Sequence, residues 1–200
     1  MDADPVEIRV LGCLIEKQRT TPDTYPLSLN ALRLACNQAT SRDPVVDYDE
    51  PTIRQALERL SFKRWVRLAS GPGSRAAKYR HLLNDALELD DQELALLAVL
   101  MLRGPQTPGE LKQRTERLHP FVAGELEETL ERLADRELVT RLARRPGEKG
   151  ERYEQLLGSG ADDEDAQPEA APAAERPSLE QRVAQLEEEV ARLRALVDRD

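Results

Sequence analysis

The sequence lacks several features that secreted, membrane and metal-binding proteins usually have. Its 200 residues include only 2 cysteines, too few for a disulfide framework, and aromatic residues make up only 4% of the chain. The beginning, MDADPVEIRV, is acidic where a secretory signal peptide is basic, and the apolar run at residues 94–102 ends at Arg103 before it could span a bilayer. We therefore expect a cytoplasmic protein with no membrane partner and with cores packed mainly by leucine.

Patterns typical of catalytic and metal sites are also missing. Cys13, Cys36, His81 and His119 each stand alone, without the C-x-x-C or H-x-x-x-H spacing of zinc ligands. The glycines of SGPGSR, residues 70–75, do not follow the G-x-x-x-x-G-K pattern that cradles phosphates. Cys36 with a histidine is the nearest catalytic alternative, but nothing in the sequence places either histidine beside it. We expect no catalytic residue, no metal, no cofactor and no enzyme activity.

Acidic charge is concentrated at one end of the chain. The formal net charge is −9, and residues 158–200 contribute −7 of it, with 5 Arg against 12 Asp and Glu. Residues 1–157 are nearly balanced, with 24 Lys and Arg against 26 Asp and Glu. The acidity of the whole chain therefore does not exclude an anionic partner for residues 1–157.

Two segments of residues 1–86 recur in the same order in residues 87–157. EIRVLGCL, which begins at Glu7, aligns with ELALLAVL, which begins at Glu93. Further on, the segment that begins LERLSFKRW aligns with the one that begins LERLADREL. Shared segments in the same order indicate a duplication, so we predict two domains, at residues 1–86 and 87–157.

Each copy is predicted to form three helices followed by a β-hairpin. In the first copy the helices are expected at residues 8–17, 28–36 and 51–63, and the strands are VRLA and AKYRHL around the turn SGPGSR. In the second copy the third helix is expected at residues 124–134, and RPGEKG is the hairpin tip. This order predicts a mainly α protein with small β-hairpins, of the α+β class, with two tandem winged-helix domains related to helix-turn-helix proteins.

Two further segments are predicted after the duplicated domains. Residues 158–177 are acidic and contain no Val, Ile, Leu or aromatic residue, so a disordered linker is expected. Residues 178–200 follow a heptad pattern with Val at a and Leu at d, which favours a parallel coiled coil and a homodimer. The predicted dimerisation residues are Leu179, Val183, Leu186, Val190, Leu193 and Val197. Two alternatives stay open: roughly three heptads are too short to hold a dimer alone, or the helix folds back on its own chain.

Three long motifs resemble one bacterial protein family. LGCLIEKQRTTPDTYPLSLNALRLACNQATSRDPV, GSRAAKYRH and LMLRGPQTPGELKQRT are similar to the corresponding segments of the YceH-like proteins. The resemblance covers residues 6–157, and Val46 stands where the family often has Met. It implies tandem winged-helix domains and a C-terminal heptad segment, but it implies no reaction and no catalytic residue.

The first copy carries the most basic stretch of the chain, because residues 59–81 contain seven Lys and Arg and no Asp or Glu. In a winged helix the third helix enters the major groove and the hairpin follows the DNA backbone, so cations here would neutralise phosphates. An exposed Arg or Gln on that helix could also read base edges. The buried stripe of the helix is predicted to be Ile53, Ala56, Leu57 and Leu60. The residues predicted to contact double-stranded DNA are Arg54, Gln55, Arg59, Lys63, Arg64, Arg67, Arg75, Lys78 and Arg80. The alternative is a basic surface that contacts only solvent.

The third helix of the second copy is predicted to have an acidic outer face. Its inner residues would be Leu126, Thr129, Leu130 and Leu133, and its outer residues Glu125, Glu127, Glu128 and Glu131. Four carboxylates would repel phosphates, so we expect this domain to bind protein. The favoured hypothesis is thus a regulatory DNA-binding protein. The rival hypothesis is a non-catalytic adaptor of tandem winged helices that binds no DNA.

The polar stretch after Cys36 is the last candidate site. Leu29, Leu32 and Cys36 have helical spacing, so the thiol is expected to be buried and inert at the end of the second helix. The loop that follows has side-chain donors suited to a phosphate or to a partner's backbone. These candidate loop contacts are Asn37, Gln38, Thr40, Ser41 and Arg42. The alternative is that they only brace the loop.

Overall fold

The computed structural model describes residues 3–70, 76–143 and 150–158. Within these residues the chain is a mixed α+β structure of helices and small antiparallel sheets, so the predicted class is confirmed at that level. Arg75, most of both predicted hairpin tips, the linker after Gly158 and the heptad segment lie outside the described residues. No helix in the described part of the chain is long and apolar enough to cross a membrane.

The helices of the first repeat begin at capping residues. They are α1 (Pro5–Thr20), α2 (Leu29–Cys36) and α3 (Glu50–Phe62). Asp4 and Glu7 form a capping box on α1, with both backbone-to-carboxylate hydrogen bonds at 2.8 Å. Ser28 caps α2 and Asp49 caps α3. The predictions for α2 and α3 are confirmed to within one residue at each end. Helix α1 is longer than predicted because the capping box and Pro5 start it earlier.

The first repeat carries a three-stranded antiparallel sheet. The predicted hairpin consists of β2 (Val66–Leu68) and β3 (Lys78–His81). A further strand, β1 (Leu27–Ser28), pairs with the other edge of β3, so the order is β1-β3-β2. The sequence does not predict β1, because a two-residue strand is defined only by its partner. The short helix α4 (Leu83–Leu87), which follows β3, and the 3₁₀ turn η1 (Pro22–Thr24) were not predicted either.

The second repeat has the predicted helices and hairpin. Its elements are α5 (Asp91–Arg103), α6 (Pro108–Thr115), α7 (Glu125–Asp135), β4 (Val139–Leu142) and β5 (Arg152–Gln155). Asp90 and Glu93 form a capping box on α5, as Asp4 and Glu7 do on α1. Gln106 bridges to Tyr153 of β5 where Leu27 pairs with the aligned Tyr79 of β3. The two copies therefore share strand placement as well as sequence.

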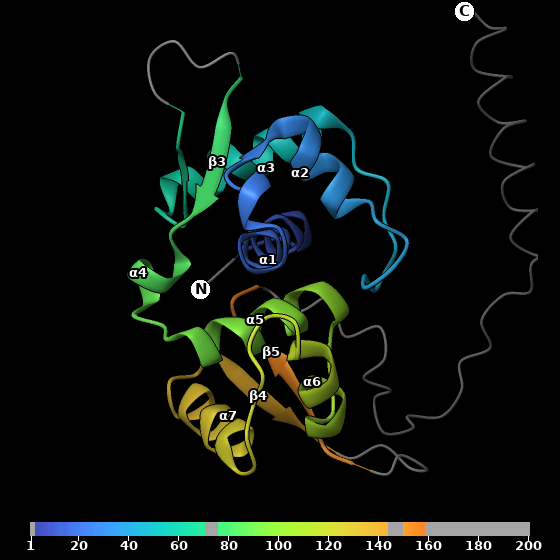
Figure 1. Ribbon diagram of the computed structural model, residues 1–200, viewed down its shortest axis with the longest axis vertical. Helices are drawn as coiled ribbons and strands as arrows, with labels where there is room; N and C mark the ends of the chain where they lie inside the picture. The colour runs from blue at the N-terminus through green and yellow to red at the C-terminus, as the bar shows by residue number, and fades with distance from the viewer. Residues whose placement is uncertain (1–2, 71–75, 144–149, 159–200) are drawn as a thin grey trace, which may run out of the picture. The chain divides into compact units, whose positions relative to one another are not determined.

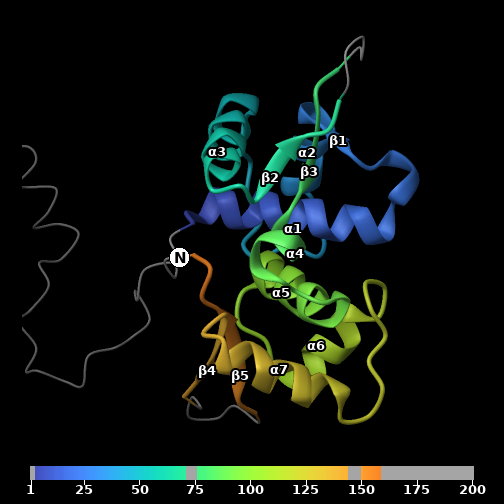
Figure 2. The same cartoon turned by 90° about the vertical axis from the view of Figure 1, so that its left-hand side faces the viewer.

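Helices α1 and α5 pack against each other at the centre of the described residues. Figures 1 and 2 show α2, α3 and the β1–β3 sheet on the far side of α1, and α6, α7 and the β4–β5 hairpin on the far side of α5. Gly12 permits this contact, because a Cβ added there would lie 2.9 Å from Cγ of Leu102 and 3.0 Å from Cβ of Met101. Buried apolar side chains of both repeats form one continuous core.

Both central helices are covered on more than one face. Residues 7–15 of α1 and 93–102 of α5 are all buried. Apolar residues spaced by three in both helices, such as Ile8, Leu11 and Leu14, account for one buried face. The additional burial arises because each helix contacts its own repeat on one side and the other repeat's helix on another, so that in α1 even Glu7 and Arg9 are buried.

Candidate nucleic-acid interface

The outer face of α3 has the predicted composition. Ile53, Ala56, Leu57 and Leu60 are at most 2% exposed, which confirms the predicted buried stripe. Arg54, Gln55 and Glu58 are exposed to solvent on the opposite side. Phe62, in the last turn, is 88% exposed, and the sequence analysis did not single it out. Helix α3 therefore presents hydrogen-bond donors together with one aromatic ring.

Two of the cations predicted to bind DNA form ion pairs with carboxylates of the protein itself. Arg59 contacts Asp4 with 2.5 Å between Nη2 and Oδ2, and Lys63 contacts Glu7 with 2.9 Å between Nζ and Oε2. Glu7 is only 2% exposed, so its charge requires a cation close by. Arg59 and Lys63 thus neutralise the capping box of α1, which reduces the charge they can offer to a phosphate.

The same ion cluster occurs in the second repeat. Arg132 contacts Asp90 at 3.0 Å, and Arg136 contacts the buried carboxylate of Glu93 at 3.1 Å. By sequence alignment these residues correspond to Arg59, Lys63, Asp4 and Glu7 of the first repeat. The signal was present in the sequence: each copy has D-x-x-E at the start of its first helix and two cations four residues apart near the end of its third. We infer that the cluster serves folding in both copies.

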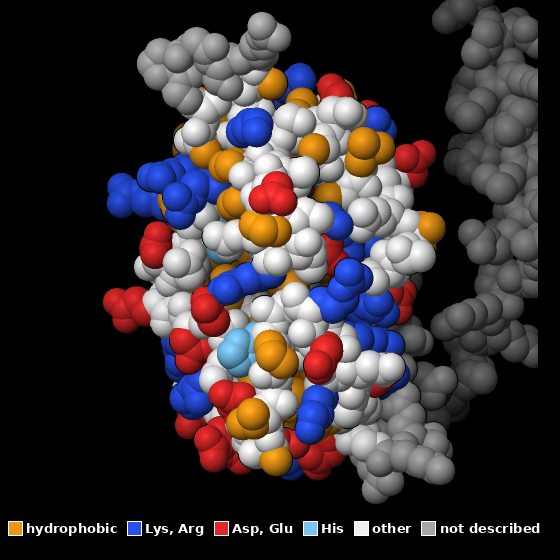
Figure 3. All heavy atoms as spheres, in the orientation of Figure 1, with side chains coloured by type: hydrophobic (Ala, Val, Ile, Leu, Met, Phe, Trp, Pro, Cys, Tyr) orange, Lys and Arg blue, Asp and Glu red, His pale blue; other side chains and the backbone are white. Residues whose placement is uncertain are grey.

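The β2–β3 hairpin holds cations that have no such partner among the described residues. Arg67 lies directly opposite Arg80 in the β2–β3 register, and Lys78 is exposed in β3. The Nε atom of Arg80 is buried, and no atom of residues 3–70, 76–143 or 150–158 accepts a hydrogen bond from it. Like charges that face each other across a ladder destabilise it unless an anion lies near. Figure 3 shows Lys and Arg side chains gathered beside this hairpin.

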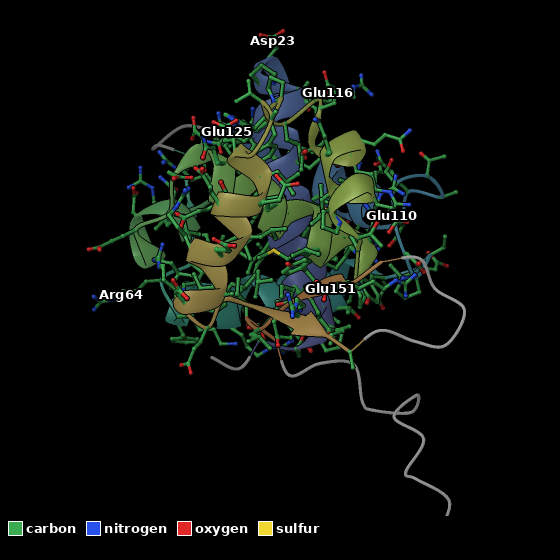
Figure 4. The ribbon with its side chains drawn as sticks, turned by 90° about the horizontal axis from the view of Figure 1, so that it is seen from below. Asp23, Arg64, Glu110, Glu116, Glu125 and Glu151 are labelled. Atoms are coloured by element: carbon green, nitrogen blue, oxygen red, sulfur yellow. The ribbon has the colours of Figure 1, made fainter. Side chains whose placement is uncertain are left out.

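Arg64 extends this basic surface at the turn between α3 and β2. Its backbone has a φ of 60°, its side chain is exposed, and Figure 4 shows it pointing away from the other elements. Within the described residues, Arg54, Arg64, Arg67, Lys78 and Arg80 have no ion-pair partner within 4 Å. The nine predicted residues therefore fall into three groups. Two are cations paired with α1, six are described residues of α3, of the turn after it and of the β2–β3 hairpin, and Arg75 lies outside the described residues.

Helix α7 differs from α3 in the charge of its outer face. Leu126, Thr129, Leu130 and Leu133 are buried as predicted, and Glu127, Glu128 and Glu131 are exposed. The prediction for Glu125 needs correction, because it is half-buried. Its Oε2 accepts a hydrogen bond from the Val122 N–H at 3.0 Å and lies 3.9 Å from His119 Nε2. Figure 4 shows Glu125 at the first turn of α7, where a carboxylate favours the helix dipole.

The five candidate loop residues fall into two groups. The amide of Asn37 donates to the Tyr48 carbonyl at 2.8 Å and accepts from the Tyr48 N–H at 2.9 Å. The Arg42 side chain is fully buried and donates to both oxygens of Glu16, at 3.0 and 2.6 Å. These two side chains brace the loop. Gln38, Thr40 and Ser41 instead line a cavity.

Both thiols are buried, which for Cys36 confirms the prediction. Cys13 and Cys36 are each 0% exposed, and their side chains are neighbours. The hydrogen bond between the two thiols, followed by burial, raises the pKa of Cys36 well above its ordinary value, so this thiol stays protonated and is a poor nucleophile. Among the described residues no group of His, Cys, Asp and Glu could hold a metal ion.

Comparisons with known proteins give a consistent family. Residues 3–148 match the family described as "Protein of unknown function, DUF480". The chain is 54% identical over 172 residues to a UPF0502 protein of Geotalea daltonii, covering 83% of this chain and 78% of that protein. It is 51% identical over 195 residues to a UPF0502 protein of Pelobacter propionicus, covering 94% and 88%. A UPF0502 protein of Shewanella sp. (strain MR-7) is 44% identical over 209 residues, covering 96% and 94%.

These matches span nearly all of the described residues, and they agree with the resemblance to YceH-like proteins found in the sequence. The chain belongs to the DUF480, or UPF0502, family of bacterial proteins.

Proposed function

We propose that the protein binds double-stranded DNA through α3 and the β2–β3 hairpin of the first repeat, in a regulatory role. The observation that carries this proposal is the facing pair Arg67 and Arg80, which has no carboxylate partner among the described residues and lies beside Lys78. A phosphate backbone would supply the missing anions. Arg54 and Gln55, on the exposed face of α3, would then reach base edges.

In this proposal residues 1–86 and 87–157 are two winged-helix domains. Three helices followed by an antiparallel hairpin in both copies support it, as does the equivalent pairing of Tyr79 and Tyr153 with an upstream segment. Residues 158–177 would be the linker, and the heptads of residues 178–200 would supply a second copy for a two-fold DNA site. Light scattering on the full chain tests the dimer, and a monomer mass would refute it.

Fluorescence anisotropy with labelled duplex DNA at a series of salt concentrations tests DNA binding. The test variant is Arg67→Gln with Lys78→Gln, and the control is Lys112→Gln with Arg141→Gln, which removes the same charge from exposed sites of the second repeat. Each lost phosphate contact reduces the slope of log K against log salt by about 0.9, so the test variant should lose roughly 1.8. An equal loss in both variants, or no salt-dependent binding by the unmodified protein, would refute the proposal.

A non-catalytic adaptor is the second candidate function. The observation that favours it is the exposed carboxylate face of α7, formed by Glu127, Glu128 and Glu131, which suits a basic peptide better than a nucleic acid. An adaptor of this kind would show no salt-sensitive DNA binding near physiological ionic strength, so the same titration separates the two functions.

A further inference from the structure

A cavity of about 580 Å³ lies where the two repeats meet. Its wall is formed by the end of α1, the segment after α2, the end of α5, and α6 with the residues that follow it. Residues of both copies therefore line it, and its volume falls in the range of about 300–1,000 Å³ that is typical of small-molecule sites. Figure 3 shows Lys and Arg side chains gathered on the surface where the repeats meet.

The cavity is lined by four cations, which are Lys17, Arg103, Arg114 and Arg117. Lys17 and Arg114 each have a carboxylate oxygen 3.3 Å away, from a residue on their own helix. Arg103 and Arg117 have no ion-pair partner within 4 Å in the described part of the chain. The cavity wall therefore holds guanidinium groups whose charge is not neutralised.

Glu16, the carboxylate in the cavity wall, is already paired within the protein. The buried Arg42 side chain donates to both of its oxygens, and Lys17 lies beside them. Burial raises the pKa of Glu16, but the hydrogen bonds and the charge of Arg42 outweigh burial and hold that pKa below its ordinary value. Glu16 is therefore ionised and already paired within the protein. The cavity wall keeps an excess of positive charge.

Like charges are crowded around Arg103. Partial burial, and then the charges of Arg114 and Arg42, lower its pKa, while the weaker influences of Glu16 and Asp43 raise it. Such crowding is unfavourable in an empty site and is relieved by a bound anion. The geometry of the wall and this electrostatic imbalance thus favour the same kind of ligand.

Neutral donors and apolar groups complete the wall. Thr40 and Ser41 contribute hydroxyl groups from the loop after α2, and Ser41 is held at a φ of 60°. Hydroxyl and guanidinium donors together are the usual partners of phosphate oxygens, because guanidinium groups bind them in a bidentate manner. Val99, Leu102 and Leu118 provide apolar surface on which the carbon part of a ligand could pack.

We propose that this cavity binds a small phosphorylated metabolite, with its phosphate groups held by Arg103, Arg114 and Arg117 and by the hydroxyls of Thr40 and Ser41. A small molecule fits better than a DNA backbone, because Arg103 and Lys17 are only partly exposed and both repeats surround the site. The site is separate from the hairpin cations that the proposed DNA binding uses, so either proposal can fail alone.

Isothermal titration calorimetry and thermal unfolding of the full-length protein with inorganic pyrophosphate test the site. Citrate serves as a carboxylate anion of similar charge, and sodium chloride keeps the ionic strength constant. We expect a saturable rise in melting temperature with pyrophosphate, because a ligand that binds only the folded state stabilises it by mass action. Arg103→Gln with Arg117→Gln should weaken pyrophosphate binding by about tenfold or more, because two charged donors are lost.

Two further variants keep the test decisive. Arg117→Gln alone changes an exposed side chain, so the protein should fold normally and still bind pyrophosphate several-fold more weakly. Arg67→Gln with Lys78→Gln removes the same charge from the hairpin and should leave pyrophosphate binding unchanged. The proposal is overturned if citrate or chloride stabilises the protein as much as pyrophosphate does. It is equally overturned if the Arg103 and Arg117 variants bind as the unmodified protein does, or if the hairpin variant loses binding too.

Discussion

The two repeats use the same ion cluster for folding but present opposite charges to solvent. In each, two cations at the end of the third helix hold the capping-box carboxylates of the first helix. Outside this cluster, α3 and its hairpin expose Arg and Lys, whereas α7 exposes glutamates. The buried part of the duplicated pattern has therefore been kept while the exposed part has diverged. The number of Lys and Arg residues in each copy therefore overstates the positive charge that its surface presents to a partner.

The largest effect is expected at the contact between the two copies. Gly12 of α1 stands where α5 has Ala98, and its neighbours leave no room for a side chain. Gly12→Leu should lower the free energy of unfolding by about 3 kcal/mol, because the added atoms force α1 and α5 apart. Thermal and urea unfolding measure the change.

Gly109→Ala in α6 is the control for this substitution. No atom of the described residues lies within 4 Å of a Cβ added at Gly109, and it is exposed in a helix, so alanine should stabilise the protein by up to about 1 kcal/mol. If Gly12→Leu proved harmless, the close approach of the repeats in solution would be refuted.

A pH-dependent change in the free energy of unfolding, of similar size, should distinguish the sheet of the first repeat from that of the second. Burial, and then the charges of Arg80 and Arg19, lower the pKa of His81 from 6.5 to about 4. Above pH 6.5 the imidazole is neutral whether or not the chain is folded. As the pH falls from 6.5 toward 4, the unfolded chain binds the proton first, so stability is lost, by about 3 kcal/mol at about 1.4 kcal/mol for each pH unit.

The second repeat suggests the variant that tests this pH effect. Gln155 occupies the position that aligns with His81 and does not titrate. His81→Gln should therefore reduce the difference in unfolding free energy between pH 7 and pH 4, measured by urea unfolding at each pH. If variant and unmodified protein lost equal stability on acidification, the shifted pKa of His81 would be wrong.

A smaller effect should distinguish the capping carboxylates. Glu7→Gln and Glu93→Gln should each lower the free energy of unfolding by about 2 kcal/mol, because each removes a buried charge that two cations contact. Urea unfolding should show similar losses in the two variants.

DNA binding should respond to only one of these two substitutions. Glu7→Gln removes a negative charge that Lys63 contacts at the end of α3 and should tighten binding to duplex DNA several-fold, or about 1 kcal/mol. Glu93→Gln removes the corresponding negative charge beside the acidic α7 and should change affinity little. Equal gains in anisotropy titrations would contradict the assignment of DNA binding to the first repeat.

Local structure was largely predictable from the sequence. Helices α2, α3 and α7 begin where cap residues, Pro51 and apolar spacing place them, because these signals act within a few residues of the chain. Strand β1 was not predictable, since its two residues become a strand only by pairing with β3. The burial of Arg42 was missed for the same reason, as its partner Glu16 is distant in sequence.

The candidate sites were predictable only in part. Residues 59–81 contain seven Lys and Arg and no Asp or Glu, which correctly predicts a basic hairpin region. The pairing of Arg59 and Lys63 with α1 was not predictable, because it depends on tertiary packing. The cavity was not predictable from the sequence, because residues of both copies form its wall and neither copy forms it alone. One signal was available: the nearly unbroken apolar run in α5 exceeds what a single repeat can cover.

The all-round burial of α1 and α5 also limits how this chain could have been shortened during evolution. Loss of either repeat would expose apolar side chains such as Leu97 or Leu11 to water and would create an aggregation-prone surface. A deletion that removed one copy would therefore be selected against even if the other copy kept every residue that contacts a partner. Packing at the centre constrains both copies together, whereas the exposed residues of their outer surfaces carry no such constraint.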